Sequence, residues 1–292
     1  MEFEISVIIP TVDRSSITLE TLRSFENQTS DDFELIVIDQ TSGGSTPLSD
    51  FSTRKYHYRY IAIKRKGLPN ARNVGAEAAG GEILLFVDDD VIPSPELIAD
   101  YINEFKRHGE EIWVVGGKIY EAGSKILNER KNISGGYITF YGKTLKNFYS
   151  DSYSECQWAA GGNFGVRRDK FFEAGGFDTN YIGNAIMEDG DFGFSVRKQG
   201  GRVLYSPKPE IEHLRASSGG TRRSAPAEGM YYRAHNTVYF FRKFNRSLLL
   251  PVVFLYLNGV ALKDLLNRRH GFKAFYYTWS GFLKGLTTEL AL

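Results

Sequence analysis

The sequence predicts an α/β fold, a half-Rossmann arrangement in which a mixed sheet is flanked by helices and followed by a C-terminal helical appendage. Three observations predict this fold class. Short apolar runs rich in Val and Ile alternate with helix-length polar segments over roughly the first third of the chain. Acidic residues directly follow several of these runs. From residue 229 onward, the apolar residues recur with helical spacing.

Four apolar runs predict parallel strands joined by crossover helices. They cover residues 5–10, 33–39, 58–63 and 82–87. The helices predicted around them cover residues 15–28, 68–79 and 94–106. The helix over 68–79 closes at two glycines, and the helix over 94–106 opens with a serine cap followed by proline. This alternation predicts the half-Rossmann part of the fold.

The rest of the chain divides into a glycine- and aromatic-rich middle and a helical tail. Shorter strands are predicted at 112–119, 163–167 and 202–206, and helices at 229–244, 248–266 and 271–290. The apolar stretch 248–262 counts about 15 residues, fewer than the roughly 20 needed to span a bilayer. We therefore expect the tail to lie on a membrane or to pair with a second subunit rather than to cross a membrane.

The charge is unevenly distributed although the formal net charge is only +1. From Ser195 to the end there are 16 Lys and Arg against 5 Asp and Glu, whereas the first 194 residues have 20 against 30. An acidic body suits a metal, and a basic tail suits a polyanion or an anionic membrane, or else it is a solvated helix surface. The one cysteine, Cys156, excludes an internal disulfide and suits a reducing cytoplasm. A strand, in place of a cleaved signal peptide, is expected within the first ten residues.

Polar residues stand where the predicted strands end. Thr11 and Asp13 follow the first strand, Asp39 ends the second, and residues 88–90 follow the fourth. Ligands of open parallel α/β sheets bind outside the carboxyl ends of the strands. Each of these residues alone is equally compatible with a turn, but together they predict a binding site at one sheet edge.

Three consecutive aspartates, Asp88, Asp89 and Asp90, repel one another unless a cation neutralises them. A hard divalent cation prefers such oxygen ligands, and a bound diphosphate would complete its coordination. If the strand continues, Asp88 and Asp90 lie on one side and Asp89 turns away. The alternative interpretation is a solvated acidic turn.

Five segments, in order from about residue 5 to residue 213, resemble the family-2 glycosyltransferases of the GT-A fold. They read SVIIPT, LIVID, GLPNARNVGAEAAGGEILLFVDDDVIP, GGNFGVRRDKFFEAGGFD and MEDGDFGFSVRKQGGRVLYSP, the last followed by His213. The resemblance implies inverting transfer of a sugar from a nucleoside-diphosphate donor, with Mn²⁺ or Mg²⁺ as cofactor. It also implies a catalytic domain over 1–228, with a nucleotide-binding part at about 1–118 and an acceptor-binding part at about 119–228, before the appendage 229–292.

The same resemblance assigns roles to individual residues. It implies nucleotide-sugar binding by Pro10, Thr11, Asp13, Asp39, Arg72, Asp88 and Asp89. It implies metal binding by Asp90 and His213. It implies a catalytic pair, Glu188 and Asp189, of which Asp189 is the base. The predicted residues of the acceptor side or its loops are Trp158, Gly162, Asn163, Arg222 and Arg223.

Several of these assignments have a simpler alternative. Asp39 could cap a helix, Arg72 could pair with an acid, and His213 could be structural. The glycines within 159–163 either admit a ligand close to the backbone or form a tight turn. Acids at the start of the helix near Asp189 favour its macrodipole, and their mutual repulsion would raise one pKa.

Two departures from the family pattern leave the substrates open. The base-binding segment reads Asp39-Gln40-Thr41-Ser42, which leaves uridine, thymidine and guanosine donors open. The Gln-x-x-Arg-Trp motif of processive synthases is absent, and residues 217–227 stand in that region. We therefore expect one sugar per encounter, on a saccharide or lipid-linked acceptor, in cell-surface polysaccharide synthesis. The expected location is cytoplasmic, peripheral on the membrane face, without nucleic acid and with a homodimer as an alternative use of the tail.

Other protein classes fit the sequence less well. A catalytically degenerate nucleotide-sugar or glycan-binding protein would normally lose one of the acids Asp88, Asp90 or Asp189. A nucleotidyltransferase would show a glycine-rich basic signature after the first strand, where this chain reads PTVDRSS. A scaffold protein would place its function in the basic helical tail.

Overall fold

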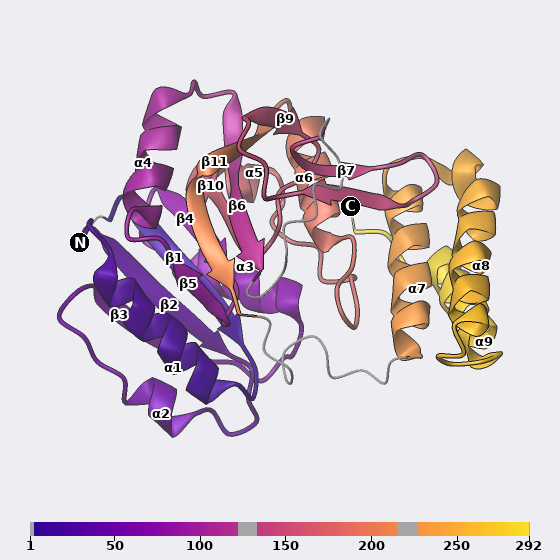
Figure 1. Ribbon diagram of the computed structural model, residues 1–292, viewed down its shortest axis with the longest axis horizontal. Coiled ribbons are helices and arrows are strands. Elements are labelled where there is room, and N and C mark those ends of the chain that lie inside the picture. The colour runs from indigo at the N-terminus through magenta and orange to yellow at the C-terminus, as the bar shows by residue number, and fades with distance from the viewer. Residues whose placement is uncertain (1–2, 122–132, 215–226, 292) are drawn as a thin grey trace.

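The computed structural model describes residues 3–121, 133–214 and 227–291, and it shows one large mixed sheet with helices on both faces (Figure 1). The strand order is β3-β2-β1-β4-β10-β6-β11-β5, and β9 pairs with β11. The four parallel strands β1–β4 are the four that the sequence predicts. Their bounds are Ile5–Thr11, Phe33–Asp39, His57–Ala62 and Ile83–Val87.

Helices cover both faces of this parallel part. The helical segments are α1 (Ser15–Ser24) with the 3-10 turn η1 (Phe25–Asn27), the one-turn helix α2 (Thr46–Ser49), α3 (Leu68–Ala78) and α4 (Leu97–Arg107). Because side chains of a strand alternate between faces, Ile8 packs with Ala71 of α3, whereas Val7 packs with Leu22 and Tyr101 on the other face. A Cβ at Gly75 would lie 2.3 Å from Ile8, so this glycine lets α3 approach β1 closely.

The second half of the sheet is antiparallel where it meets the first. Its strands are β5 (Val91–Pro93), β6 (Ile112–Glu121), β9 (Ser154–Cys156), β10 (Asn163–Arg167) and β11 (Arg202–His213). Strand β10 runs antiparallel to both β4 and β6. The hairpin of β7 (Gly135–Ile138) and β8 (Thr144–Asn147) lies outside this sheet. Strands β6 and β10 were predicted, and β5 was not. Strand β11, with 12 residues, is more than twice the predicted length because it continues past two prolines to His213.

The C-terminal helical part is present as predicted. Two helices of the middle segment, α5 (Arg168–Glu173) and α6 (Glu188–Lys198), precede α7 (Glu228–Lys243), η3 (Ser247–Leu249), α8 (Leu250–Leu266) and α9 (Lys273–Thr287). Tyr239, Phe240 and Phe241 of α7 are fully buried in the same cluster as Phe192 of α6. Helix α7 therefore belongs to the main hydrophobic core, and α8 extends that core with Val253 and Leu257. Helices α8 and α9 lie beside α7 on the side away from the sheet (Figure 1).

One helical segment, Ser247–Leu266, is 20 residues long with a mean hydropathy of 1.6, and by length and composition alone it could cross a membrane. The predicted apolar stretch was shorter because the count stopped at Lys263, whereas the helix continues to Leu266. Only 22% of this segment is buried inside the protein. Most of its residues are therefore at least partly exposed.

The single cysteine, Cys156 on β9, is buried. Burial raises the pKa of its thiol to about 11. A thiol that remains protonated and inaccessible is chemically inert.

Candidate functional site

The predicted binding edge is formed by the carboxyl ends of β1, β2 and β4. The parallel register pairs Thr11, the last residue of β1, with Asp39, the last residue of β2. Asp39 is fully buried, and both of its carboxylate oxygens accept hydrogen bonds of 2.8 Å, from the Thr41 N–H and from the Tyr60 hydroxyl. A carboxylate fixed in this way has a set orientation toward any group that enters beside it.

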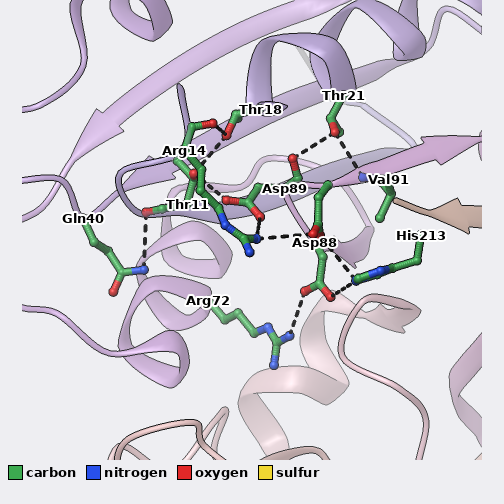
Figure 2. A network of polar contacts seen from close by, with 11 residues as sticks. Thr11, Arg14, Thr18, Thr21, Gln40, Arg72, Asp88, Asp89, Val91 and His213 are labelled. Carbon is green, nitrogen blue, oxygen red and sulfur yellow. Dashed lines mark hydrogen bonds and ion pairs between the residues drawn. The ribbon is translucent and has the colours of Figure 1, made fainter. Parts of the chain in front are cut away.

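Asp89 points toward Thr11 and Arg14 (Figure 2), as was predicted for a continuing strand, although β4 ends at Val87. The Thr11 hydroxyl donates to Asp89 at 2.6 Å, and Arg14 Nη1 lies 2.8 Å from its other oxygen. Burial raises the pKa of Asp89 to about 6, although the contacts with Thr11 and Arg14 act in the opposite direction. This aspartate therefore ties the end of β1 to the end of β4.

Asp88 turns toward His213 (Figure 2), and Asp90 also contacts this histidine. His213 Nε2 lies 3.4 Å from an oxygen of Asp88 and 3.3 Å from an oxygen of Asp90. The pairing of β11 with β5 sets His213 opposite Val91, directly after Asp90. The unpredicted strand β5 and the extended β11 are therefore what bring the histidine to the two acids.

These three side chains fit a divalent metal ion. One possible ligand atom from each of Asp88, Asp90 and His213 lies within 4.8 Å of the other two. Two carboxylates and an imidazole are ligands that Mn²⁺ accepts readily, and Mg²⁺ accepts the carboxylates. The donor set therefore agrees with the predicted cofactor without distinguishing the two ions.

Arg72 forms the centre of a buried cluster of acids. Its side chain lies in α3 and bonds Glu188, while Nη1 is 3.2 Å from Asp189 and Nη2 is 3.8 Å from Asp88. The guanidinium also lies 5.2 Å from the centre of the Phe177 ring. Arg72 therefore pairs with acids, as one of the two sequence interpretations held, but the acids come from other elements and not from its own helix.

The carboxylates of Glu188, Asp189 and Asp88 share this one guanidinium, and the pKa of each is shifted. Burial raises the pKa of Glu188 to about 8, although Arg72 opposes that shift. Burial also raises the pKa of Asp189. The pKa of Asp88 is lowered despite its burial, because His213 and Arg72 favour its ionised form. The predicted perturbation at the start of α6 is thus present, but its main cause is burial rather than mutual repulsion.

Asp189, like Asp88, remains partly open to the site. Its side chain is 28% exposed, whereas that of Glu188 is 4% exposed. The backbone N–H of Gly161 donates to Asp189 Oδ2 at 3.1 Å. Arg72 and Gly161 hold the two oxygens of this carboxylate from different elements, so its position is well defined.

The glycines before β10 leave room for these acids. A Cβ at Gly161 would lie 2.3 Å from an Arg72 nitrogen and 2.4 Å from Asp189 Oδ1. A Cβ at Gly162 would lie 2.6 Å from Asp88 Oδ2. The glycine pair therefore admits the protein's own acidic side chains close to the backbone.

The remaining predicted residues lie at varying distances from this cluster. Pro10 is buried within β1, and Asp13 is exposed with a left-handed φ of 50°. Trp158 is buried against Phe148, and the amide of Asn163 bonds Tyr101 and two backbone carbonyls. The predicted acceptor-side arginines, Arg222 and Arg223, lie outside the described residues. Their roles stay predictions.

Two residues of the site were missed from the sequence. Arg14 contacts Asp89 and lies 3.4 Å from Asp90, and Tyr60 fixes Asp39. Arg14 directly follows Asp13 at the end of the first strand, which was a usable signal because that loop already held two predicted site residues. Tyr60 lies inside a strand, where an aromatic residue is ordinary, so no local signal marked it.

The comparisons with known proteins agree with this geometry. The model of the family described as "Glycosyl transferase family 2" matches residues 6–173. A glucosyl-dolichyl phosphate glucuronosyltransferase of Haloferax volcanii is 22% identical over 221 residues, which are 72% of this chain and 69% of that protein. A GalNAc(5)-diNAcBac-PP-undecaprenol β-1,3-glucosyltransferase of Campylobacter jejuni is 27% identical over 62% of this chain and 57% of that protein. An uncharacterised glycosyltransferase of Rickettsia bellii is 34% identical over 88 residues, 30% of this chain and only 13% of that protein.

Solved structures share the fold. The TarS 1-349 structure from S. aureus in complex with UDP-GlcNAc has a TM-score of 0.65 at 15% identity, covering 97% of this chain and 81% of that one. The mannosyltransferase PcManGT from Pyrobaculum calidifontis, in complex with GDP-Man and Mn²⁺, has a TM-score of 0.62 at 16% identity, covering 98% and 88%. The predicted sheet with flanking helices and a C-terminal helical part is thereby confirmed.

Proposed function

Because the chain belongs to glycosyl transferase family 2, we propose that it transfers a sugar from a nucleoside-diphosphate donor to an acceptor hydroxyl, with inversion at the anomeric carbon. The observation that carries the proposal is the convergence of Asp88, Asp90 and His213 with Asp189 at one sheet edge. Arg72 contacts both Asp88 and Asp189, so the aspartate beside the metal site and the proposed base are fixed relative to each other.

The donor nucleotide would lie along the ends of β1 and β2. Asp39 offers a fixed carboxylate to a base N–H, and Thr11 lies beside it in the neighbouring strand. Asp13, on the loop that follows, is exposed and hydrogen-bonded through its backbone N–H to Thr41. The relatives in complex with UDP-GlcNAc and GDP-Man support a nucleotide-sugar donor and leave its base and sugar open.

A divalent metal, Mn²⁺ or Mg²⁺, would be held by Asp88, Asp90 and His213. A bound ion of this kind supplies charge neutralisation for a departing diphosphate. The protein's own contribution is to keep these ligands in place, through the β5–β11 pairing and through the contacts of Arg14 and Arg72 with the acids. The proposal includes this metal dependence.

Asp189 is the proposed general base. A single displacement needs one positioned carboxylate that takes the proton of the attacking hydroxyl. Asp189 is partly exposed, held by Arg72 and the Gly161 N–H, and its pKa is raised by burial. Glu188 is buried on Arg72 and is proposed to position that arginine rather than to meet substrate.

We propose a saccharide or lipid-linked saccharide as acceptor, with one sugar added per encounter. Two relatives are named for dolichyl phosphate and PP-undecaprenol carriers. These names support a lipid-linked acceptor. A role in cell-surface polysaccharide synthesis, at the cytoplasmic face of the membrane, follows from that acceptor class. A homodimer through the C-terminal helices is the alternative use of that surface.

The test is a thermal-shift panel of UDP-, dTDP- and GDP-sugars with and without Mn²⁺, on the wild type and on Asp90→Ala. A ligand at about 100 times its dissociation constant stabilises the folded state by about 2.7 kcal/mol. We expect metal-dependent stabilisation by one nucleotide class that is lost in Asp90→Ala. Stabilisation without donor hydrolysis or transfer would instead identify a catalytically degenerate binding protein. The anomeric configuration of the product, read by NMR, tests inversion.

A further inference from the structure

Helices α8 and α9 form a hairpin at the end of the molecule farthest from β3, packed against α7 (Figure 1). Their inner faces are closely packed. Val253 and Leu257 of α8 are buried, and a Cβ at Gly281 of α9 would lie 2.2 Å from the Tyr231 carbonyl oxygen of α7. Among the residues that the structure describes, the hairpin therefore packs on α7 through the inner faces of its two helices.

The opposite side of each helix carries an exposed apolar stripe. In the segment of η3 and α8, the stripe consists of positions that are alternately four and three residues apart: 248, 252, 255, 259, 262 and 266. In the segment that begins at Phe272 and continues through α9, the same spacing gives positions 272, 276, 279, 283 and 286. This spacing places each set on one helix face. Apart from Gly259, the stripe residues are Leu248, Val252, Leu255, Leu262 and Leu266, and Phe272, Tyr276, Trp279, Leu283 and Leu286, all of them exposed.

The two stripes form a single surface, which we call the outer face. Trp279 Nε1 donates to Asn258 Oδ1 at 2.8 Å, from the stripe of α9 across to α8. The rings of Phe254 and Phe282 meet between the helices with their centroids 4.9 Å apart. The stripe positions contain no charged residue. Contiguous apolar surface of this extent is rare on a monomeric protein without an interaction role.

The charges around the outer face indicate what covers it. The exposed basic residues of the hairpin are Lys263, Arg268, Arg269, Lys273 and Lys284. The acid of the hairpin, Asp264 near the end of α8, is buried against His270 at 2.9 Å, so it does not offset these cations at the surface. Apolar helices bordered by Lys and Arg, with Trp and Tyr among the apolar residues, are typical of segments that lie in the interface of an anionic bilayer.

The packing of α8 also argues how it would sit. A helix that crossed the bilayer would have to leave α7 and expose the ionisable Asp264 of its inner face to lipid, which is costly. A helix that keeps its inner face on the protein and turns its stripe outward keeps its contacts with α7 and leaves Asp264 buried. We infer that the outer face of α8 and α9 docks on the surface of an anionic membrane, with both helices lying in the plane of the interface.

The test uses the full chain without donor or acceptor, so its outcome is independent of the proposed transferase activity. Flotation is measured with vesicles of phosphatidylcholine and with equimolar mixtures of phosphatidylcholine and phosphatidylglycerol. We expect binding to the anionic vesicles that weakens at high salt. Leu255→Glu/Leu283→Glu, at two positions that are 70% and 63% exposed, should lower the partition coefficient at least tenfold while leaving the melting temperature unchanged.

Two further variants separate the causes. Arg268→Gln/Arg269→Gln should lower the partition coefficient about fivefold for each charge removed, on anionic vesicles only. Phe172→Glu, at a 42% exposed apolar position on α5, is the matched control and should bind as the wild type does. Absence of flotation by the wild type would overturn the inference. A chain that is dimeric in solution, that becomes monomeric in Leu255→Glu/Leu283→Glu and that ignores vesicles would assign the outer face to a second copy.

Discussion

Arg72 Nη1 lies 3.2 Å from Asp189 Oδ1, although the two residues are 117 positions apart in the chain. The same guanidinium bonds Glu188 and approaches Asp88. One cation from α3 therefore holds acids that come from the start of α6 and from the end of β4.

Breaking the buried Arg72–Glu188 pair should destabilise the fold. In buffer above pH 8, where Glu188 is ionised in the folded protein, Arg72→Met leaves this carboxylate buried without its cation, and the free energy of unfolding should fall by about 3–5 kcal/mol. The double variant Arg72→Met/Glu188→Leu removes both charges and should recover part of the loss. Urea unfolding of the single and double variants measures the coupling between the two residues. Strictly additive losses would show that they do not act as a pair.

Replacing the proposed base should lower kcat strongly while leaving the affinity for the donor unchanged. In Asp189→Asn the side chain keeps its shape but cannot accept the proton, so kcat should fall about 10²–10⁴-fold. The dissociation constant of the donor, measured by calorimetry, should stay within about twofold. Asp169→Asn, an acid that is 72% exposed on α5, serves as control. Full turnover in Asp189→Asn would exclude it as the base.

The three consecutive aspartates should differ in metal binding. Asp90→Asn and His213→Ala should each lower manganese affinity, because both residues belong to the candidate ligand group. Asp89→Asn should retain manganese binding, since Asp89 faces Thr11 and Arg14, and should mainly lower stability. Titration of free Mn²⁺ by calorimetry gives the affinities. Equal losses in Asp89→Asn and Asp90→Asn would contradict the division of roles.

Glu188 should make stability fall as the pH rises. Its pKa is raised from 4.5 to about 8 in the folded protein, so between these values the folded state holds a proton that the unfolded state has lost. Its contribution is therefore present below pH 4.5 and is lost progressively as the pH rises to about 8. In Glu188→Gln this slope should disappear. Urea unfolding of both chains across this range, with chelator present, gives the comparison, and parallel slopes would refute the assignment.

Tyr60 should matter for donor binding through Asp39. Tyr60→Phe removes one of the two hydrogen bonds that orient this carboxylate. A hydrogen bond to a charged group contributes roughly 1.5–3 kcal/mol, so the dissociation constant of the donor should rise about tenfold or more. Tyr58→Phe is a matched control, since the Tyr58 hydroxyl donates to the Leu48 carbonyl in the same region. Equal effects of the two variants would mean that Asp39 does not depend on Tyr60.

The sequence predicted those parts of the site that depend on local patterns. Asp39 and Asp88 follow continuous apolar runs, and such runs identify buried parallel strands whose ends share one edge. Apolar runs of this kind can be recognised from a few neighbouring residues. Glu188 and Asp189 were expected at a helix start, but their roles came from the family resemblance and not from a local pattern.

What the sequence did not predict depends on contacts between distant segments. Strand β11 continues through Pro207 and Pro209, residues that argue against a strand, and it does so with a register shift between Tyr205 and Glu210. The length that brings His213 to Asp90 was therefore hidden. The partners of Arg72 were hidden too, because they depend on how α6 packs against α3 and not on either helix alone.

The buried thiol of Cys156 has a practical consequence. The chain has one cysteine, whose thiol is buried and has its pKa raised to about 11. The folded protein therefore offers maleimide reagents no reactive thiol. A cysteine installed in place of Ser280 or Thr287 would then be the sole site of conjugation, with no native residue to remove first. An environment-sensitive fluorophore at such a position would report, by its emission colour, whether α9 is in water, in lipid or against another protein.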